Sequence, residues 1–415
     1  MMHPYVRHFF SDPMLLVIVY ALLAVYAWAL LWIVDRFAGS QLSLVSVQSG
    51  KMVSIEGLRG ILACAVVIHH TYCWFIFLGG AEWSSGGSIL FMRMASFGVI
   101  QFFYLSGYLF WRKLIKAGNI RLVPFYLSRW IRIAPAYFAC VGLALLVGVL
   151  STGFTLREPI RDMAFEILRW GFFSLLGRPR INGINMMRIT CGVTWTLALE
   201  WLFYFSLPLL GWFARRNRRL WILFALFGLM YLSTVSIGSH SRIGLTIWGA
   251  INLLSNFGRF MFLGFGGGIL VATNESRIRD WTHRLGNNAS WILLGCSTAY
   301  LLIPGNGSTM GMVLEVFLLP AFALVVGGTD LFGFLVWRPI RLLGVISYPI
   351  YLVHGVIFYA AMKLRGGMHA VPLPTYMAQS ALCIFCVLVM AMLVHIFIEL
   401  PTMHLSERIG RRPFA

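Results

Sequence analysis

Long apolar segments separated by short polar ones recur along this 415-residue chain. The first runs from Pro13 to Val34, and the others lie at about 56–78, 89–111, 132–150, 193–213, 220–238, 250–272, 291–303, 309–327, 342–362 and 376–398. A helix that crosses a bilayer needs roughly 20 mainly apolar residues, because each residue adds about 1.5 Å. The pattern therefore predicts an all-α, polytopic integral membrane protein with a ten-helix core and one extra N-terminal transmembrane helix.

A polar linker, Asp35 to Val53, separates the first apolar segment from the rest. We therefore divide the chain into residues 1–53, the extra helix with its linker; residues 54–401, a ten-helix transmembrane domain; and residues 402–415, a basic tail. No small-residue cleavage site precedes the linker, so we expect the first segment to be retained as a helix rather than removed as a signal peptide.

The composition supports a membrane protein. Hydrophobic residues make up 59% of the chain and charged residues only 11%, against roughly 25% charged in soluble domains. The net charge is +19, but Lys and Arg gather in short loops between apolar segments, as in the cytoplasmic loops of membrane proteins. This distribution indicates the lipid bilayer as the partner and argues against nucleic acid.

The same charges predict the orientation. Residues 112–131, 215–219, 273–290 and the C-terminal tail hold most of the basic residues of the loops, so we place them in the cytoplasm. Residues 151–192 carry six arginines yet fall on the outer side. Long loops follow the rule poorly, and Ile160 to Leu176 has the pattern of an interfacial amphipathic helix.

The seven cysteines predict neither a disulfide framework nor a metal site. Most of them lie within apolar segments, which is typical of small residues that pack between helices.

Arg59 and His70 are the most informative pair in the first core segment. They are eleven residues apart, so on a helix they lie within about 20° of one stripe and about 16 Å apart along the axis. Both are costly in hydrocarbon, which indicates a functional cavity. The alternative is that Arg59 reaches the headgroups and His70 bonds to a neighbouring helix.

Further ionisable and polar residues lie in or at the ends of the other segments. They are Arg129, Arg132, Trp195, Glu200, Arg259, Ser347, Tyr348, Tyr351, His354 and Glu399. A structural scaffold has no reason to bury so many ionisable groups in a membrane. An intramembrane enzyme and a proton-coupled transporter both would, and the absence of a convincing inverted repeat favours the enzyme.

Several motifs resemble, in order, those of the membrane-bound acyltransferase family 3. They are residues 54–59 (SIEGLR) followed by His70, 102–109 (FFYLSGYL), 129–137 (RWIRIAPAY), 195–204 (WTLALEWLFY), 343–354 (LGVISYPIYLVH) and 398–401 (IELP). The sequence departs from the family pattern at Glu56, where aspartate is usual, and at Trp201, where a second acidic residue is common. Neither departure affects the arginine and histidine pair.

This resemblance implies a function. Family members move an acyl group from a cytoplasmic thioester, usually acetyl-CoA, to a hydroxyl on a surface glycan, lipid-linked sugar or secondary metabolite. We therefore expect a bacterial inner-membrane O-acetyltransferase that acts on an O-antigen or exopolysaccharide. Acyl-CoA would be the co-substrate, no cofactor would be tightly bound, and a homo-oligomer is left open. The alternatives are succinyl transfer, acylation of a small lipophilic metabolite, and a proton-coupled transporter.

The same resemblance and the residue types suggest roles. His70 suits a general base or a transient acyl acceptor, whereas His69 points about 100° away and is expected to pack. Glu200 is expected to orient an imidazole or bind sugar hydroxyls, and Arg59 to position the thioester carbonyl as well. Arg59, Arg129 and Arg132 are expected to bind the phosphates of the donor. For Arg129 and Arg132 the alternative is ordinary cytoplasmic anchoring.

The remaining candidates are expected to line the acceptor cavity. They are Ser106, Trp195, Tyr204, Arg259, Ser347, Tyr348, Tyr351 and His354. Three alternatives stay open: Glu200 as the buried partner of Arg259, His354 as a hydrogen-bonded interfacial histidine, and Ser106 with its neighbouring glycine as a point of close helix approach.

Overall fold

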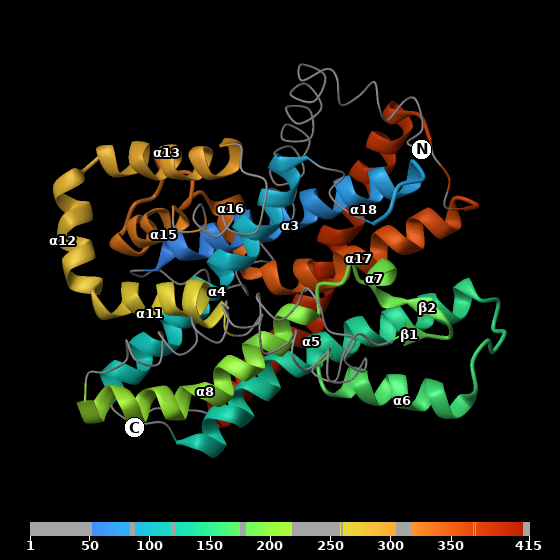
Figure 1. The fold of residues 1–415 in the computed structure, drawn as a ribbon, viewed down its shortest axis with the longest axis horizontal. Coiled ribbons are helices and arrows are strands. Elements are labelled where there is room, and N and C mark those ends of the chain that lie inside the picture. Colours follow the sequence, from blue (N-terminus) through green and yellow to red (C-terminus); the bar gives the residue numbers. More distant parts are fainter. Residues whose placement is uncertain are drawn as a thin grey trace, which may run out of the picture.

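The computed structural model describes residues 52–83, 88–117, 121–174, 180–217, 258, 260–303, 315, 317–367, 369 and 371–409. Within these residues nearly all regular structure is helical, and one short hairpin is the only sheet (Figure 1). The prediction of an all-α chain is confirmed to that extent.

The helices are α3 (Val53–Leu78), α4 (Ile89–Ala117), α5 (Leu122–Ser151), α6 (Ile160–Gly171), α7 (Met186–Ile189), α8 (Trp195–Asn217), α11 (Gly266–Thr273), α12 (Glu275–Leu285), α13 (Asn288–Leu302), α15 (Leu318–Gly327), α16 (Arg338–Val345), α17 (Ser347–Leu364), α18 (Leu373–Val394) and α19 (Leu400–Ile409). Two π-helical segments, η2 (Phe260–Phe265) and η3 (His395–Glu399), adjoin α11 and α19. Strands β1 (Arg180–Ile181) and β2 (Ile184–Asn185) pair antiparallel.

Within the described residues, four helical stretches are long and apolar enough to cross a membrane. They are Val53–Leu78, Ile89–Lys116, Leu122–Ser151 and Leu373–Leu405, and a fifth span results if the bent pair α16 and α17 is counted as one. The ten-helix core and the N-terminal helix remain predictions. The segment Pro13 to Val34, the segment 220–238 and the end of the basic tail lie outside the described residues.

The region expected to be a long cytoplasmic loop, 112–131, is mostly helical. Helix α4 continues through Ala117 and α5 begins at Leu122, ten residues before the predicted span. The apolar pattern marks only the part of a helix that lies in hydrocarbon, whereas the backbone hydrogen bonds continue into polar surroundings. Arg129 consequently lies inside a helix rather than on a loop, and Arg132 lies in the interior of α5 rather than at its start. Residues 273–290, also expected to be a loop, contain α12.

The segment predicted as one span at 342–362 consists of two helices that meet at 71°. The break falls at Ile346, where the Ser347 hydroxyl donates a hydrogen bond to the Gly344 carbonyl at 2.8 Å. Pro349 follows in the first turn of α17, where its missing N–H has no helical partner to lose. After the bend, α17 packs against α3.

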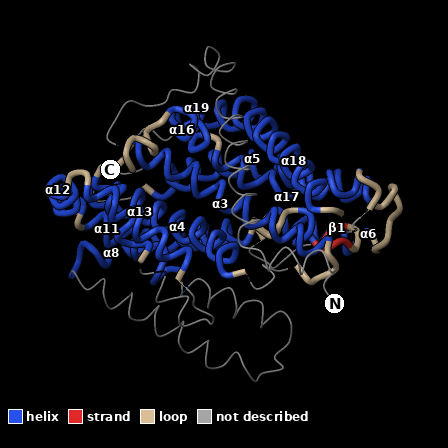
Figure 2. The backbone as a smooth tube through the Cα atoms, turned by 90° about the horizontal axis from the view of Figure 1, so that it is seen from above, coloured by secondary structure: helices blue, strands red, loops and turns tan. Residues whose placement is uncertain are grey.

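Helix α3 lies at the centre of the packing and contacts α4, α16 and α17 (Figures 1 and 2). Glycines allow these contacts to be close. A Cβ at Gly57 would meet the backbone of Leu335, and a Cβ at Gly344 would meet the carbonyl of Glu56. Across the helix junction, Arg341 of α16 forms an ion pair with Glu56 at 3.0 Å. These contacts fix the end of α3 that carries Arg59.

The amphipathic helix begins at Ile160 as predicted and ends at Gly171, before the expected boundary. Its apolar side chains Phe165 and Leu168 are about half exposed, at 53% and 51%. The Tyr137 hydroxyl donates to the carbonyl of Trp170 at 3.0 Å and so ties α6 to α5. Its place at the membrane interface remains a prediction.

Candidate active site

Two histidines from distant parts of the chain meet between α3 and α17. The Nδ1 atom of His70 lies 3.0 Å from the Nε2 atom of His354, and the rings are stacked with centroids 5.0 Å apart. His354 is fully buried, and its Nδ1 lies 3.1 Å from the carbonyl oxygen of Ile350. His70 keeps partial exposure. The residue expected to line a cavity is therefore the direct partner of His70.

The preceding histidine has a separate set of contacts. His69 Nδ1 lies 2.7 Å from the carbonyl oxygen of Phe91, and its Nε2 lies 3.5 Å from Cys73 Sγ. Its ring meets that of His70 edge-on at 4.8 Å. These contacts are those of a packing neighbour.

A cysteine lies against the histidine pair. The potential ligand atoms of His70, His354 and Cys191 all lie within 4.8 Å of one another. The turn that carries Cys191 has a left-handed backbone, with φ of 53° there. It presses on α17 where Gly355 has no Cβ to block it. Imidazole and thiolate are ligands that Zn²⁺ accepts, so this group could hold a metal ion. The sequence did not suggest one, because the three residues are far apart in the chain.

The other end of α3 carries a cluster of charges. Arg59 is acted on electrostatically by Arg132, Glu399, Glu56 and Glu200. The structure therefore brings Arg59, Arg132 and Glu200 together as the motifs suggested. It also adds Glu399, which the sequence offered only as part of a closing motif.

Glu200 and Arg129 belong to the same cluster. Glu200 accepts a hydrogen bond from the Tyr204 hydroxyl one turn along α8, and Arg129, Arg132 and Arg59 act on its charge. The guanidinium of Arg129 lies 5.1 Å from the centre of the Phe110 ring, and its buried Nε has no hydrogen-bond partner among the described residues. Glu200 thus faces arginines rather than an imidazole. Arg259, its alternative partner, lies outside the described residues.

The hydroxyl groups of α17 are engaged with the protein. Tyr348 donates to the Ile133 carbonyl at 2.9 Å, and the Tyr351 hydroxyl lies 2.9 Å from that of Thr196 and donates to the Val193 carbonyl at 3.1 Å. Ser347 caps the bend described above. These residues join α17 to α5 and to the start of α8, so their first role in the structure is to hold these helices together.

The last two cavity candidates lie near η2. The Trp195 ring is 6.4 Å from that of Phe103 and 5.4 Å from that of Phe260. Ser106 is partly buried, and at the next position a Cβ on Gly107 would meet the backbone of Phe265. Close helix approach accounts for Gly107, and the role of Ser106 remains a prediction.

A sequence profile described as an acyltransferase domain matches residues 52–398. The chain belongs to the membrane-bound acyltransferase family 3. The resemblance stated from the motifs is therefore confirmed, over nearly the whole of the predicted domain 54–401.

Relatives of this acyltransferase family member carry related names. The chain is 30% identical over 180 residues to "Nodulation protein 10" of Rhizobium leguminosarum bv. viciae, covering 41% of this chain and 47% of that protein. It is 25% identical over 261 residues to a "Putative O-acetyltransferase" of Staphylococcus aureus (strain MSSA476), covering 61% and 35%. The chain thus spans about half of the first relative and about a third of the second. No solved structure matches it.

One buried pair near Arg59 was missed in the sequence. His395 Nδ1 lies 2.6 Å from Glu399 Oε2, and both side chains are only 3% exposed. The spacing of four residues could have indicated the pair, because such residues are neighbours on a helix. Glu399 links this pair to Arg59, and the π-helical turn η3 sets its position.

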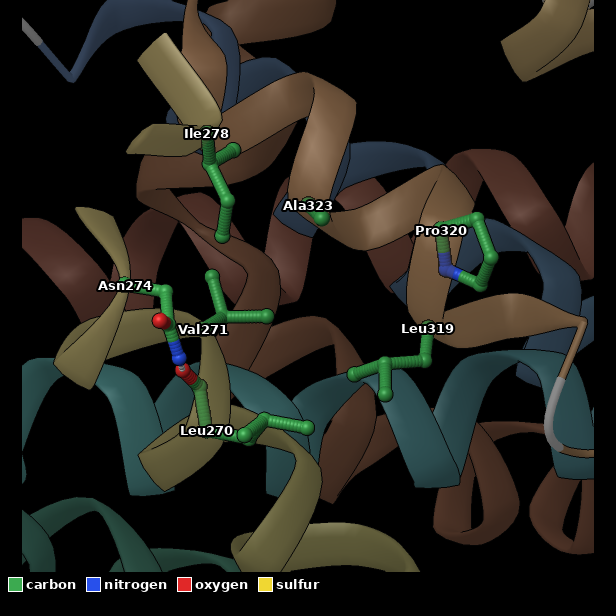
Figure 3. Close-up of a pocket in the computed structure, with 7 residues that line it drawn as sticks. All are labelled: Leu270, Val271, Asn274, Ile278, Leu319, Pro320 and Ala323. Carbon is green, nitrogen blue, oxygen red and sulfur yellow. Dashed lines mark hydrogen bonds between the residues drawn. The ribbon is translucent and has the colours of Figure 1, made fainter. Parts of the chain in front are cut away.

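An apolar cavity of about 270 Å³ lies elsewhere, between α11, α12 and α15 (Figure 3). It is lined by Leu270, Val271, Asn274, Ile278, Leu319, Pro320 and Ala323. None of the candidate site residues lines it, so we do not assign it to the reaction.

Proposed function

We propose that this chain is an integral-membrane O-acyltransferase. It moves an acyl group, acetyl in the simplest case, from cytoplasmic acyl-CoA to a hydroxyl of a surface polysaccharide or lipid-linked sugar. Membership of the acyltransferase family and the names of the relatives support acyl transfer to oxygen. The observation that carries the proposal is that one helix, α3, holds Arg59 in a charged cluster and His70 in a histidine pair.

The arginine cluster suits the acyl donor. Arg59, Arg129 and Arg132 provide three guanidinium groups, and the buried Nε of Arg129 is a donor without a partner among the described residues. Guanidinium groups bind phosphate oxygens through paired, charge-assisted hydrogen bonds. We expect the phosphates of coenzyme A to lie here, at the cytoplasmic end of α3.

The histidine pair suits the proton transfer. The acceptor hydroxyl attacks the thioester carbonyl, its O–H proton passes to His70, the new C–O bond forms and the C–S bond breaks. Coenzyme A leaves as a thiolate and takes the proton back from His70. In a relay, His70 would first accept the acyl group itself and pass it to the hydroxyl. Both routes depend on the same imidazole.

The test uses the full chain purified into lipid nanodiscs with acetyl-CoA labelled in the acetyl group. Loss of the thioester that depends on His70 supports the proposal, and mass spectrometry of surface glycans from a deletion strain then identifies the acceptor. Proton-coupled uptake into vesicles with no loss of thioester would contradict it and favour the transporter.

The charge distribution supports a location in the bacterial inner membrane with the C-terminus in the cytoplasm. Single cysteines at residues 215–219 and 363–375, in a background without the native cysteines, can be labelled with an impermeant thiol reagent. Labelling of 363–375 alone from outside spheroplasts is expected. Labelling of 215–219 would contradict this orientation and show that residues 160–176 cross the membrane.

A further inference from the structure

The hydrogen bonds of His354 determine which of its nitrogens carries the proton. Its Nδ1 lies 3.1 Å from the Ile350 carbonyl oxygen, which can only accept. A neutral imidazole has one N–H, so the proton is on Nδ1 and Nε2 is an acceptor. The neutral form is the expected one, because the side chain is fully buried and none of the ion pairs among the described residues includes it.

The tautomer of His354 determines the tautomer of His70. His70 Nδ1 lies 3.0 Å from the acceptor Nε2 of His354, so His70 Nδ1 must be the donor. A neutral His70 then has an unprotonated Nε2. His70 also forms a hydrogen bond with the Val66 backbone, one turn earlier on α3, and its ring is partly exposed.

We propose that His354 is a positioning residue that fixes the tautomer of His70 and leaves His70 Nε2 free to accept the proton of the acceptor hydroxyl. The series of hydrogen bonds runs from the Ile350 carbonyl through His354 and His70 to the substrate hydroxyl. This inference rests on the proposed function, in which His70 performs the proton transfer.

The arrangement follows the logic of a carboxylate that orients a catalytic histidine, with a neutral imidazole in place of the carboxylate. When His70 Nε2 takes a proton, its Nδ1–H becomes a charge-assisted donor to His354 Nε2, which stabilises the cation. A neutral partner avoids the cost of a permanently buried charge beside the base.

His69 provides an internal contrast. Its Nδ1 faces the Phe91 carbonyl and its Nε2 faces Cys73 Sγ, so both nitrogens are occupied. It has no free acceptor for a substrate proton, although it lies next to His70 in the chain. The proposal therefore explains why only His70, of the two adjacent histidines, is available to accept a proton from the substrate.

The direct test is nitrogen NMR of the full chain in nanodiscs with ¹⁵N-labelled histidine, because protonated and unprotonated ring nitrogens have well-separated shifts. The His70 signals are identified by their loss in His70→Gln. We expect an unprotonated Nε2 in the native protein and a mixture of tautomers in His354→Leu. A protonated His70 Nε2 in the native protein would overturn the proposal, whether or not acyl transfer is detected.

A matched pair of variants adds a kinetic test. The amide of glutamine has an NH2 donor group and a carbonyl acceptor about as far apart as the two imidazole nitrogens, so His354→Gln should keep most of the kcat. His354→Leu keeps the volume without an acceptor and should lower kcat by about 10–100-fold, the range for a lost supporting hydrogen bond, with little change in donor KM. A purely structural role predicts equal losses in both, which would overturn the proposal, as would equal activity in both.

A metal ion is the competing occupant. Zn²⁺ bound in one equivalent by the purified native protein, and lost in both Cys191→Ser and His354→Leu, would place an ion rather than a proton between the two nitrogens. That result would overturn the tautomer assignment while leaving acyl transfer itself to be judged by the thioester assay.

Discussion

The two ends of the site on α3 are built from different interactions. At one end, Arg59 lies among the charges of Arg132, Glu200 and Glu399. At the other, His70 is held by His354, and the described residues offer it no ion pair. The two ends are about 16 Å apart along a single helix, since eleven residues separate them. A rigid helix thus keeps the charged region and the neutral region at a fixed separation.

This difference follows from depth in the membrane. Charges are tolerated at the end of a span, where headgroups, water and opposite charges compensate them. Deeper in the span, an uncompensated charge is costly, and neutral groups hydrogen-bonded to backbone carbonyls are the stable solution. The comparison separates donor binding, expected at the arginine end, from proton transfer, expected at the histidine end.

The largest effect should come from the histidine end. His70→Ala should fold normally and lose at least about 10²–10⁴ in rate, the usual contribution of a general base. Acyl transfer and thermal stability of the purified variant measure the two properties. His69→Ala is the matched control and should be milder, because His69 only packs. A greater loss of acyl-transfer rate for His69→Ala would show that His69, not His70, performs the proton transfer.

The arginine end should respond mainly in donor binding. Substituting glutamine for Arg59, Arg129 or Arg132 removes a charge-assisted hydrogen bond of roughly 1.5–3 kcal/mol, which raises the donor KM by roughly 10- to 150-fold. The Arg59→Gln variant lowers kcat as well if Arg59 also contacts the thioester in the transition state. Steady-state kinetics and calorimetry with acetyl-CoA measure both.

Arg121→Gln is the control for this series, because Arg121 is exposed just before α5 and outside the cluster. Equal effects of all four substitutions would reduce the arginine end to a nonspecific basic surface. Unchanged donor binding across the set would remove the phosphate assignment.

Packing at the arginine end can be tested with a single methyl group. Gly57→Ala would place a Cβ against the Leu335 backbone and force α3 to move. We expect a loss of stability of about 1–3 kcal/mol, seen as a lower unfolding temperature, together with a raised donor KM. Gly142→Ala on α5 is the control, because a Cβ there meets no atom within 4 Å. Similar behaviour of the two variants would show that the position of Arg59 does not depend on this contact.

The smallest effect concerns Glu275, which lies outside the spans at the start of α12. Burial acts to raise the pKa of Glu275, but the hydrogen bond from Arg112 at 2.6 Å and the charges of Arg112 and Arg279 outweigh it, so the pKa is held below its ordinary value. A carboxyl group whose pKa is lower in the folded state stabilises the protein at pH values above its unfolded-state pKa of about 4.3. This stabilisation is lost as the pH falls through the folded-state pKa.

Glu275→Gln should therefore cost about 1 kcal/mol or less at neutral pH, and the difference from the native protein should vanish in strong acid. Unfolding temperatures measured across pH check this. Donor KM should not change, because the pair lies outside the Arg59 cluster. A constant difference at all pH values would mean that the ion pair is not its cause.

The sequence alone determined the class of the protein and the stripe shared by Arg59 and His70. Hydrophobic length is a local property, so it predicted α3 to within a few residues. Helical geometry placed the arginine and the histidine on one face without any knowledge of neighbours. The ordered motifs led to the family that the profile confirms over residues 52–398.

Only the tertiary structure decided what faces that stripe. His354 and Cys191 reach His70, and Glu399 reaches Arg59, through helix packing between segments far apart in the chain. The bend at Ile346 and the close approaches at Gly57 and Gly344 position the helices that make these contacts. Such contacts depend on how several helices fit together at once, and hydrophobic pattern and spacing describe one helix at a time. The tautomer of His70 is decided at this level, because it depends on which atom of another helix lies 3.0 Å away.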